Sequence, residues 1–420
     1  MKHNKRFKAG IVAVLAVAIT LTGCSGAGGG ATGAGDDSGR GPITFASGKD
    51  FTQEMQNLID TWNDKNPGEE VTMLQLSASP DEQRTSFVQN FQAKSDKYDV
   101  LWSDVVWTSE FAARGWIEEL DKARFGGDQL LASAVDTAIY DGKLYGAPFM
   151  TNAQLLYYRS DLIPTAPTTW AELQAACEIA KANKMDCYAG QFSQYEGLTV
   201  NTVQALNSAG GFVLSEDGKT ATVDTSEAKD GLEFLVGMFK DGNISQEALT
   251  YKEEESRRAF VEGRVMFLNN WPYVYSSASE DGSAIQGKFD MAPLPGKDGP
   301  GVASLGGIDL VVSAFSKYKE TAKDWIEFMQ SEETQRSVVM DMNQASVVAA
   351  LYDDPELIAA APYLPILKES LLGANPRPKT PNYNAVSLAI QKNAYKALQG
   401  TVSVDEALAS MQKELTEAMK

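Results

Sequence analysis

Residues 43–76 read ITFASGKDFTQEMQNLIDTWNDKNPGEEVTMLQL and contain a complete strand–helix–strand pattern. The β-prone run 43–46 precedes a segment whose apolar residues recur at helical spacing: Phe51, Met55, Leu58, Ile59 and Trp62. A second β-prone run follows at 71–76. This order predicts a β-α-β unit and therefore an α/β fold.

The alternation of strands and helices continues along the chain. Pro80 is suited to opening a second helix, and residues 98–102 form the next strand-like run. Beyond residue 150 we expect strands at 154–158 and 265–268 and a helix at 170–183. Crossover connections of this kind predict a largely parallel sheet. About 380 residues follow the N-terminal region, which is too many for one core, so we expect two domains.

The N-terminal region predicts export and lipid attachment. Residues 1–8 are basic, residues 11–21 are apolar, and the segment Leu21-Thr22-Gly23-Cys24 resembles a bacterial lipobox. We therefore expect a signal peptide at 1–23, a lipidated Cys24 and an extracytoplasmic, membrane-anchored protein. The alternative is an ordinary secretory signal with a chance cysteine. Residues 24–42 are rich in small residues and predict a flexible tether, with the folded part starting near Pro42.

Composition excludes several functions. Removal of the four basic residues of the signal changes the net charge from −19 to −23, which disfavours nucleic acid as a partner. No second apolar run is long enough to span a bilayer, so we expect membrane contact through the lipid anchor only. The single histidine, His3, lies in the signal, which argues against histidine-dependent nucleophiles and zinc sites. We therefore expect no metal. We also expect no cofactor, because the pairs Gly210-Gly211 and Gly306-Gly307 lack phosphate-binding spacing.

Two cysteines remain for the mature chain besides Cys24. Cys177 and Cys187 form an even pair in an oxidising compartment, so we predict a disulfide between a helix end and the following strand. The alternative is a pair of buried free thiols.

Aromatic and planar polar residues gather at three predicted strand ends, at 102–107, 148–159 and 269–273. Aromatic faces stack on the C–H faces of sugars, and carboxylates, amides and guanidinium groups bond to sugar hydroxyls. The clusters therefore indicate a carbohydrate site, although a tryptophan at a strand end, taken alone, is more often a core residue than a ligand platform.

These residues resemble the extracellular solute-binding lipoproteins of carbohydrate ABC importers (family 1), and within them the trehalose/maltose or α-glucoside binders. The resemblance covers the chain from about residue 43 to the C-terminus. It rests on the stretches 81–84, 98–107, 111–116, 145–149, 155–162, 270–273 and 375–378.

The resemblance implies a periplasmic-binding-protein-like (type II) fold of two α/β lobes with a ligand cleft between them. One lobe would comprise residues 43–147 and 296–345, and the other 148–295 and 346–420. The protein would be a monomer without enzymatic activity. It would capture trehalose, maltose, a maltodextrin or another α-glucoside by lobe closure and deliver it to the permease subunits and their ATPase.

The resemblance also implies a set of ligand-binding residues. These are Glu54, Arg84, Asp104, Asn152, Trp271, Tyr273, Gly306, Gly307 and Arg377. Trp271 and Tyr273 would supply the stacking surface, and the two glycines would let the backbone approach the ligand. Relatives that bind trehalose tightly often have a tryptophan at the position of Ile308, so the exact sugar stays open.

Three alternatives remain. A secreted glycoside hydrolase could use Asp104 and Glu54 as a carboxylate pair. The ligand could instead be a different sugar or a polyol. A structural or adhesion lipoprotein would bind no ligand in a cleft.

Overall fold

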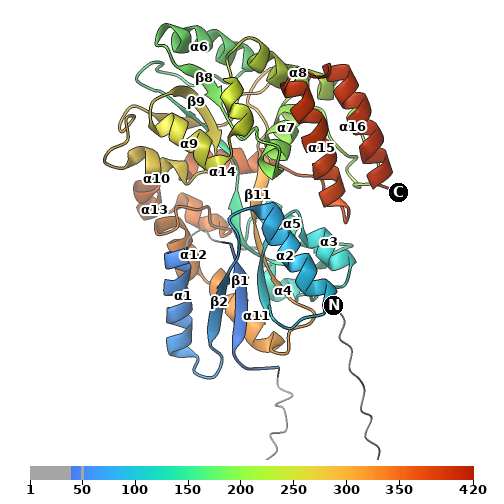
Figure 1. Ribbon diagram of the computed structural model, residues 1–420. Helices are drawn as coiled ribbons and strands as arrows, with labels where there is room; N and C mark the ends of the chain where they lie inside the picture. Colours follow the sequence, from blue (N-terminus) through green and yellow to red (C-terminus); the bar gives the residue numbers. More distant parts are fainter. Residues whose placement is uncertain (1–38, 49–51) are drawn as a thin grey trace, which may run out of the picture. The chain divides into compact units, whose positions relative to one another are not determined.

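The computed structural model describes residues 39–48 and 52–420, which fold into two α/β lobes built on separate sheets (Figure 1). The predicted signal peptide, Cys24 and most of the predicted tether lie outside the described residues. None of the helices in the described ranges combines the length and the apolar character needed to cross a membrane.

The first lobe surrounds a six-stranded sheet. Its strands are β1 (Ile43–Ser47), β2 (Val71–Gln75), β3 (Val100–Asp104), β6 (Ala147–Asn152), β11 (Ser304–Val312) and β12 (Asn375–Pro376). Their order is β12-β11-β3-β1-β2, and β6 also pairs with β11. Strand β1 is parallel to β2 and β3, which confirms the β-α-β unit expected at the start of the chain.

The second lobe surrounds a four-stranded sheet. Its order is β10 (Asp290–Ala292), β7 (Leu155–Tyr158), β9 (Val265–Asn270) and β8 (Asp186–Ala189). Only β8 and β9 pair in parallel. In the first sheet β11 is antiparallel to β3 and β6. The prediction of a largely parallel sheet is therefore wrong. Strands joined by a helical crossover within one lobe are parallel, whereas a strand that follows a crossing from the other lobe joins its sheet in the opposite direction.

Helices cover both sheets. In the first lobe they are α1 (Thr52–Lys65), α2 (Pro80–Gln92), α3 (Thr108–Ala113), α4 (Lys122–Phe125), α5 (Ala132–Thr137), α11 (Lys319–Gln330) and α12 (Glu332–Met340), with the hairpin β4 (Ile139–Tyr140) and β5 (Lys143–Leu144). In the second they are α6 (Trp170–Ala182), α7 (Glu196–Ser208), α8 (Ser226–Lys240), η1 (Gln246–Thr250), α9 (Glu253–Val261), α10 (Val274–Ser279), α15 (Tyr383–Leu398) and α16 (Val404–Ala418). The segments η2 (Ala349–Asp353), α13 (Pro355–Ala360) and α14 (Leu364–Leu372) follow α12.

Local signals set the ends of several helices. Pro80 occupies the first turn of α2, where a missing N–H costs nothing. Thr169 caps α6 and forms a reciprocal capping box with Glu172. The predicted lobe boundaries remain predictions, but sheet membership places the first chain crossing between Asn152 and Leu155 rather than at Pro148.

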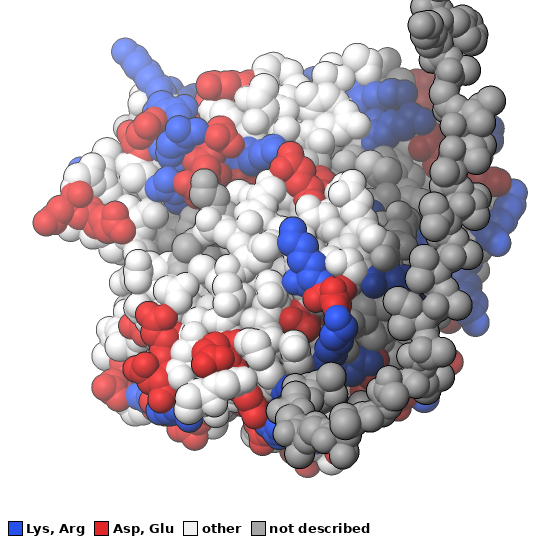
Figure 2. Space-filling view, turned by 60° about the horizontal axis from the view of Figure 1, so that its bottom comes forward, with Lys and Arg blue, Asp and Glu red and all other residues white. Residues whose placement is uncertain are grey.

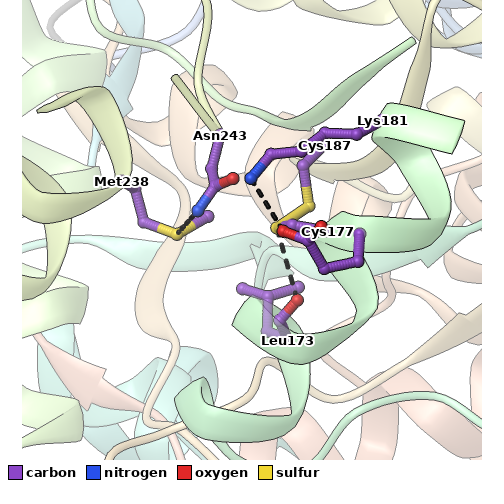
Figure 3. Close-up of a disulfide and its surroundings, with 7 residues drawn as sticks. Leu173, Cys177, Lys181, Cys187, Met238 and Asn243 are labelled. Carbon is purple, nitrogen blue, oxygen red and sulfur yellow. Dashed lines mark hydrogen bonds and ion pairs between the residues drawn. A yellow bond between two sulfur atoms is a disulfide. The ribbon is translucent and has the colours of Figure 1, made fainter. Parts of the chain in front are cut away.

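The predicted disulfide is present in the second lobe (Figure 3). Cys177 of α6 is bonded to Cys187 of β8, with 5.0 Å between their Cα atoms. Both cysteines are buried. Cys177 lies inside α6 rather than at its end, so the bond fixes the helix body to the sheet.

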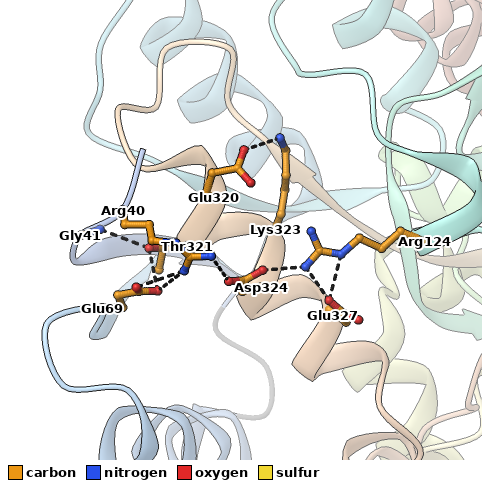
Figure 4. A network of polar contacts seen from close by, with 9 residues as sticks. All are labelled: Arg40, Gly41, Glu69, Arg124, Glu320, Thr321, Lys323, Asp324 and Glu327. Atoms are coloured by element: carbon orange, nitrogen blue, oxygen red, sulfur yellow. Dashed lines mark hydrogen bonds and ion pairs between the residues drawn. The ribbon is translucent and has the colours of Figure 1, made fainter. Parts of the chain in front are cut away.

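The first described residues are already held by the first lobe (Figure 4). The Arg40 guanidinium pairs with Glu69 at 2.9 Å and with Asp324 at 2.7 Å, and Asp324 pairs with Arg124 at 2.6 Å. The backbone N–H of Glu320 donates to the carbonyl of Gly39 at 3.0 Å. The ordered chain therefore starts at or before Gly39, earlier than the predicted start near Pro42.

Acidic and basic side chains lie in neighbouring groups on the face shown in Figure 2, with uncharged areas between them. The surface ion pairs of the protein include those of Arg124 with Asp324 and Glu327.

Candidate functional site

The candidate site lies where the carboxyl end of β3, the start of α7, strand β11 and the segment after β12 meet. Arg377 joins these elements. Its Nη2 donates to Asp104 Oδ1 at 2.9 Å, and its Nη1 donates to Glu196 Oε1 at 2.6 Å. Asp104 ends a strand of the first sheet, whereas Glu196 begins a helix of the second lobe. Arg377 thus connects the two lobes through a pair of carboxylates.

The charged groups of this cluster are buried, so each strongly affects the pKa of the others. The Arg377 side chain is 3% exposed. Burial alone would lower the pKa of Arg377, but Asp104, Tyr383 and Glu196 raise it above its usual value. Burial also raises the pKa of Glu196, which accepts hydrogen bonds from the hydroxyls of Tyr383 and Ser387. The guanidinium stays charged, and Glu196 accepts hydrogen bonds at both of its carboxylate oxygens.

The pairing of β11 with β3 and β6, together with the contact between Trp271 and Gly306, brings four more predicted ligand residues near Asp104. Gly306 lies opposite Asn152, Gly307 lies opposite Thr151, and Ile308 lies opposite Asp104. The Trp271 ring rests on Gly306, where a Cβ would lie 2.9 Å from Cη2. The structure therefore groups Asn152, Trp271, Gly306 and Gly307 with Asp104 and Arg377.

Both glycines are required by the packing. Gly307 has a φ of +143°, and a Cβ there would lie 2.4 Å from the carbonyl oxygen of Met150. At Gly306 the missing side chain leaves room for the Trp271 indole. The pair thus places an aromatic face against the central strand.

Two buried polar atoms at the site lack a protein partner. They are Nε of Arg377 and Oδ1 of Asn152. Burial raises the pKa of Tyr195, so its hydroxyl stays protonated and can donate. Buried polar atoms are normally hydrogen-bonded, and unpaired ones in a cleft are suited to ligand hydroxyls.

Sequence reasoning missed the residues that α7 and its neighbours contribute, which are Tyr195, Glu196, Asp81 and Lys252. Helix α7 is buried on almost every side, so it carries no apolar stripe that would reveal it. Asp81, at the start of α2, interacts with the backbone N–H of Glu196 and faces Lys252. Burial raises the pKa of Asp81. The Lys252 ammonium lies 5.1 Å from the centre of the Tyr195 ring.

The other three predicted ligand residues share no hydrogen bond with Asp104 or Arg377 in the described part of the chain. Arg84 is engaged by Glu110, with Nε and Nη2 at 2.9 and 2.6 Å from Oε2. The Tyr273 hydroxyl donates to Glu254 at 2.8 Å. Glu54 lies half-buried in the first turn of α1, next to the undescribed residues 49–51. Their roles in ligand binding remain predictions.

Asp309 is a buried acid beneath the site on β11. It is fully buried and accepts from the hydroxyl of Thr108 at 2.8 Å. Burial raises its pKa to about 7. Within the described ranges no group of three or more histidine, cysteine or acidic side chains is arranged to hold a metal ion.

Comparison with known proteins identifies relatives over nearly the whole chain. A family model described as "Bacterial extracellular solute-binding protein" matches residues 46–336. A probable ABC transporter-binding protein of Deinococcus radiodurans is 30% identical over 394 residues, covering 89% of this chain and 92% of that protein. A mannitol-binding protein of Pseudomonas aeruginosa is 25% identical over 409 residues, covering 87% and 90%.

A solved structure, maltose-bound MalE3 of T. maritima, superimposes with a TM-score of 0.83. It is 34% identical and covers 90% of this chain and 99% of its own. This likeness confirms the predicted two-lobed fold.

Proposed function

The chain belongs to the family of bacterial extracellular solute-binding proteins, and from this membership we propose that it captures a neutral α-glucoside between its lobes. Members of the family bind solutes for ABC importers and are not enzymes, which confirms the prediction of a binding protein. They deliver their ligand to permease and ATPase components. For this chain we propose the maltose or maltodextrin class, membrane attachment through Cys24, and the residues around Arg377 as the site.

The ion pairs support a neutral ligand. Arg377 is already neutralised by Asp104 and Glu196, and Arg84 by Glu110. An anionic sugar would have to displace a buried carboxylate from its guanidinium, which is costly. A neutral sugar needs only the open hydrogen-bonding positions of Arg377 and Asn152.

The observation that carries the proposal is the Trp271 ring lying on Gly306 beside Asp104 and Asn152. A pyranose presents a flat C–H face to such a ring, whereas an acyclic polyol does not. The maltose bound by the T. maritima relative supports this ligand class. Ile308 in place of a tryptophan removes a stacking surface that trehalose binders carry, which favours maltose and longer glucosides.

Isothermal titration calorimetry tests the proposal with maltose, maltotriose, trehalose, mannitol and glucuronate. We expect heat with the maltose series and none with glucuronate. Trp271→Ala should weaken binding by about 2 kcal/mol or more, the range of an aromatic hot spot. Leu388→Ala is the matched control, since this exposed residue lies on α15 away from the site.

Two outcomes would reject the proposal. Heat with mannitol alone would favour a polyol binder, the activity named for the P. aeruginosa relative. Disappearance of intact maltose during overnight incubation would favour the hydrolase. The lipid anchor has a separate test: mass spectrometry of membrane-extracted protein should find acyl chains on Cys24, and Cys24→Ser should release the protein.

A further inference from the structure

A second groove lies on the other side of the segment that carries Arg377. It has a volume of about 1260 Å³ and is lined by the β4–β5 hairpin of the first lobe, the end of α7 and the following loop, and residues 375–382. Of the predicted ligand residues, only Arg377 lines it. We call it the outer groove.

The outer groove displays an aromatic side chain to solvent. Phe212 is 52% exposed, and it is the one aromatic residue classed as exposed in the described ranges. Gly210 and Gly211 hold it there: Gly210 has a φ of +89°, and a Cβ on Gly211 would lie 2.5 Å from the backbone nitrogen of Ala228. The half-buried Tyr140 contributes a second ring from the first lobe. Aromatic rings at this position are available to stack on the C–H face of a sugar.

Polar side chains at the base of the outer groove lack partners. Ser109 is 6% exposed and Asn207 is 7% exposed, and neither side chain makes a hydrogen bond within the described residues. They come from different lobes, α3 and α7. The buried Nε of Arg377 is also unpaired. Buried donors and acceptors left in this state call for a polar ligand or water.

The charges and the volume of the outer groove limit the class of ligand that it can bind. Asp141 and Asp217 line the outer groove, and Lys379 is already paired with Asp136 at 2.9 Å. These charges disfavour an anion. The volume exceeds the 300–1,000 Å³ typical of small-molecule sites. A neutral oligosaccharide matches the rings, the unpaired polar groups and the size together.

We propose that the outer groove is a second carbohydrate site, which takes a neutral oligosaccharide independently of the Trp271 ring. This inference rests on the proposed function, since it assigns the same class of ligand to another surface. Arg377 borders both sites, but the rings that would contact the two ligands, Phe212 and Trp271, are different.

Calorimetry with maltohexaose and maltose tests the inference on the wild type and the variants Phe212→Ala, Trp271→Ala and Leu388→Ala. We expect two classes of maltohexaose site in the wild type. Phe212→Ala should weaken only the class that survives in Trp271→Ala, by tenfold or more. Leu388 is 53% exposed, so Leu388→Ala removes a similarly exposed apolar side chain and should change neither class.

The outcomes separate the two proposals. A single class of site that Trp271→Ala abolishes and Phe212→Ala leaves intact overturns the second site and keeps the proposed function. A wild type that binds no saccharide overturns both. Unchanged thermal unfolding of Phe212→Ala shows that any loss of binding is local.

Discussion

Replacement of Arg377 by methionine tests the ion cluster that joins the two lobes. The variant keeps the length of the side chain but leaves Asp104 and Glu196, with side chains 19% and 11% exposed, without their cation. Removing one partner of a buried pair costs about 3–5 kcal/mol. We therefore expect Arg377→Met to lower the free energy of unfolding by about 3 kcal/mol or more at pH 8.

The pH dependence gives this prediction a sign. Burial already raises the pKa of Glu196, and loss of Arg377 raises it further above the unfolded value. A carboxyl whose pKa is higher in the folded state binds more protons there, so stability falls as the pH rises. The deficit of Arg377→Met relative to the wild type should therefore shrink from pH 8 to pH 5.

Urea unfolding at both pH values measures the effect, with unchanged m-values as the check on two-state behaviour. Arg40→Met is the matched control, because Arg40 is 43% exposed and its pairs with Glu69 and Asp324 lie at the surface. Exposed pairs contribute about 0–1 kcal/mol. The reasoning is refuted if the two variants lose equal stability at pH 8, or if the deficit of Arg377→Met is the same at pH 5.

Three further predictions follow from single features. Replacing both Cys177 and Cys187 by alanine should cost about 2–3 kcal/mol, the value for a loop closed over a separation of 10 residues, and wild-type thermal stability after the change would contradict it. Asp309→Asn should flatten the pH dependence of stability: with a folded pKa of about 7, the wild type should lose roughly 2 kcal/mol relative to the variant between pH 5 and pH 8 in urea titrations. Gly306→Ala should displace the Trp271 ring and weaken maltose binding. In the Trp271→Ala background, Gly306→Ala should cause no further loss of affinity. Additive losses measured by calorimetry would show that the glycine does not act through the Trp271 ring.

Local sequence signals predicted several elements of this fold. The cap at Thr169 and the proline at the start of α2 act through neighbouring backbone groups, so they can be read from the chain. The direction of β11 could not be predicted this way, because it depends on which lobe the chain has just left. Helix α7 escaped detection because both its faces are buried.

The sequence identified individual residues of the candidate site, but it did not show which of these residues form ion pairs with each other. Asp104, Trp271 and Arg377 stood out and lie together in the structure. Nothing in the sequence pairs Arg377 with Glu196, which is far away in the chain. Likewise Arg84 attracted attention as a cation, whereas only the fold shows that Glu110 already holds it.

The clamp around Arg40 has a mechanical consequence. Gly39–Gly41 are fastened to the first lobe through Glu69 and through α11, by way of Asp324, Thr321 and the backbone of Glu320. Tension on the chain ahead of Gly39 is therefore transmitted to the first lobe. None of these fastening contacts involves Arg377, so tension from the proposed anchor enters the first lobe away from the ion cluster that joins the two lobes.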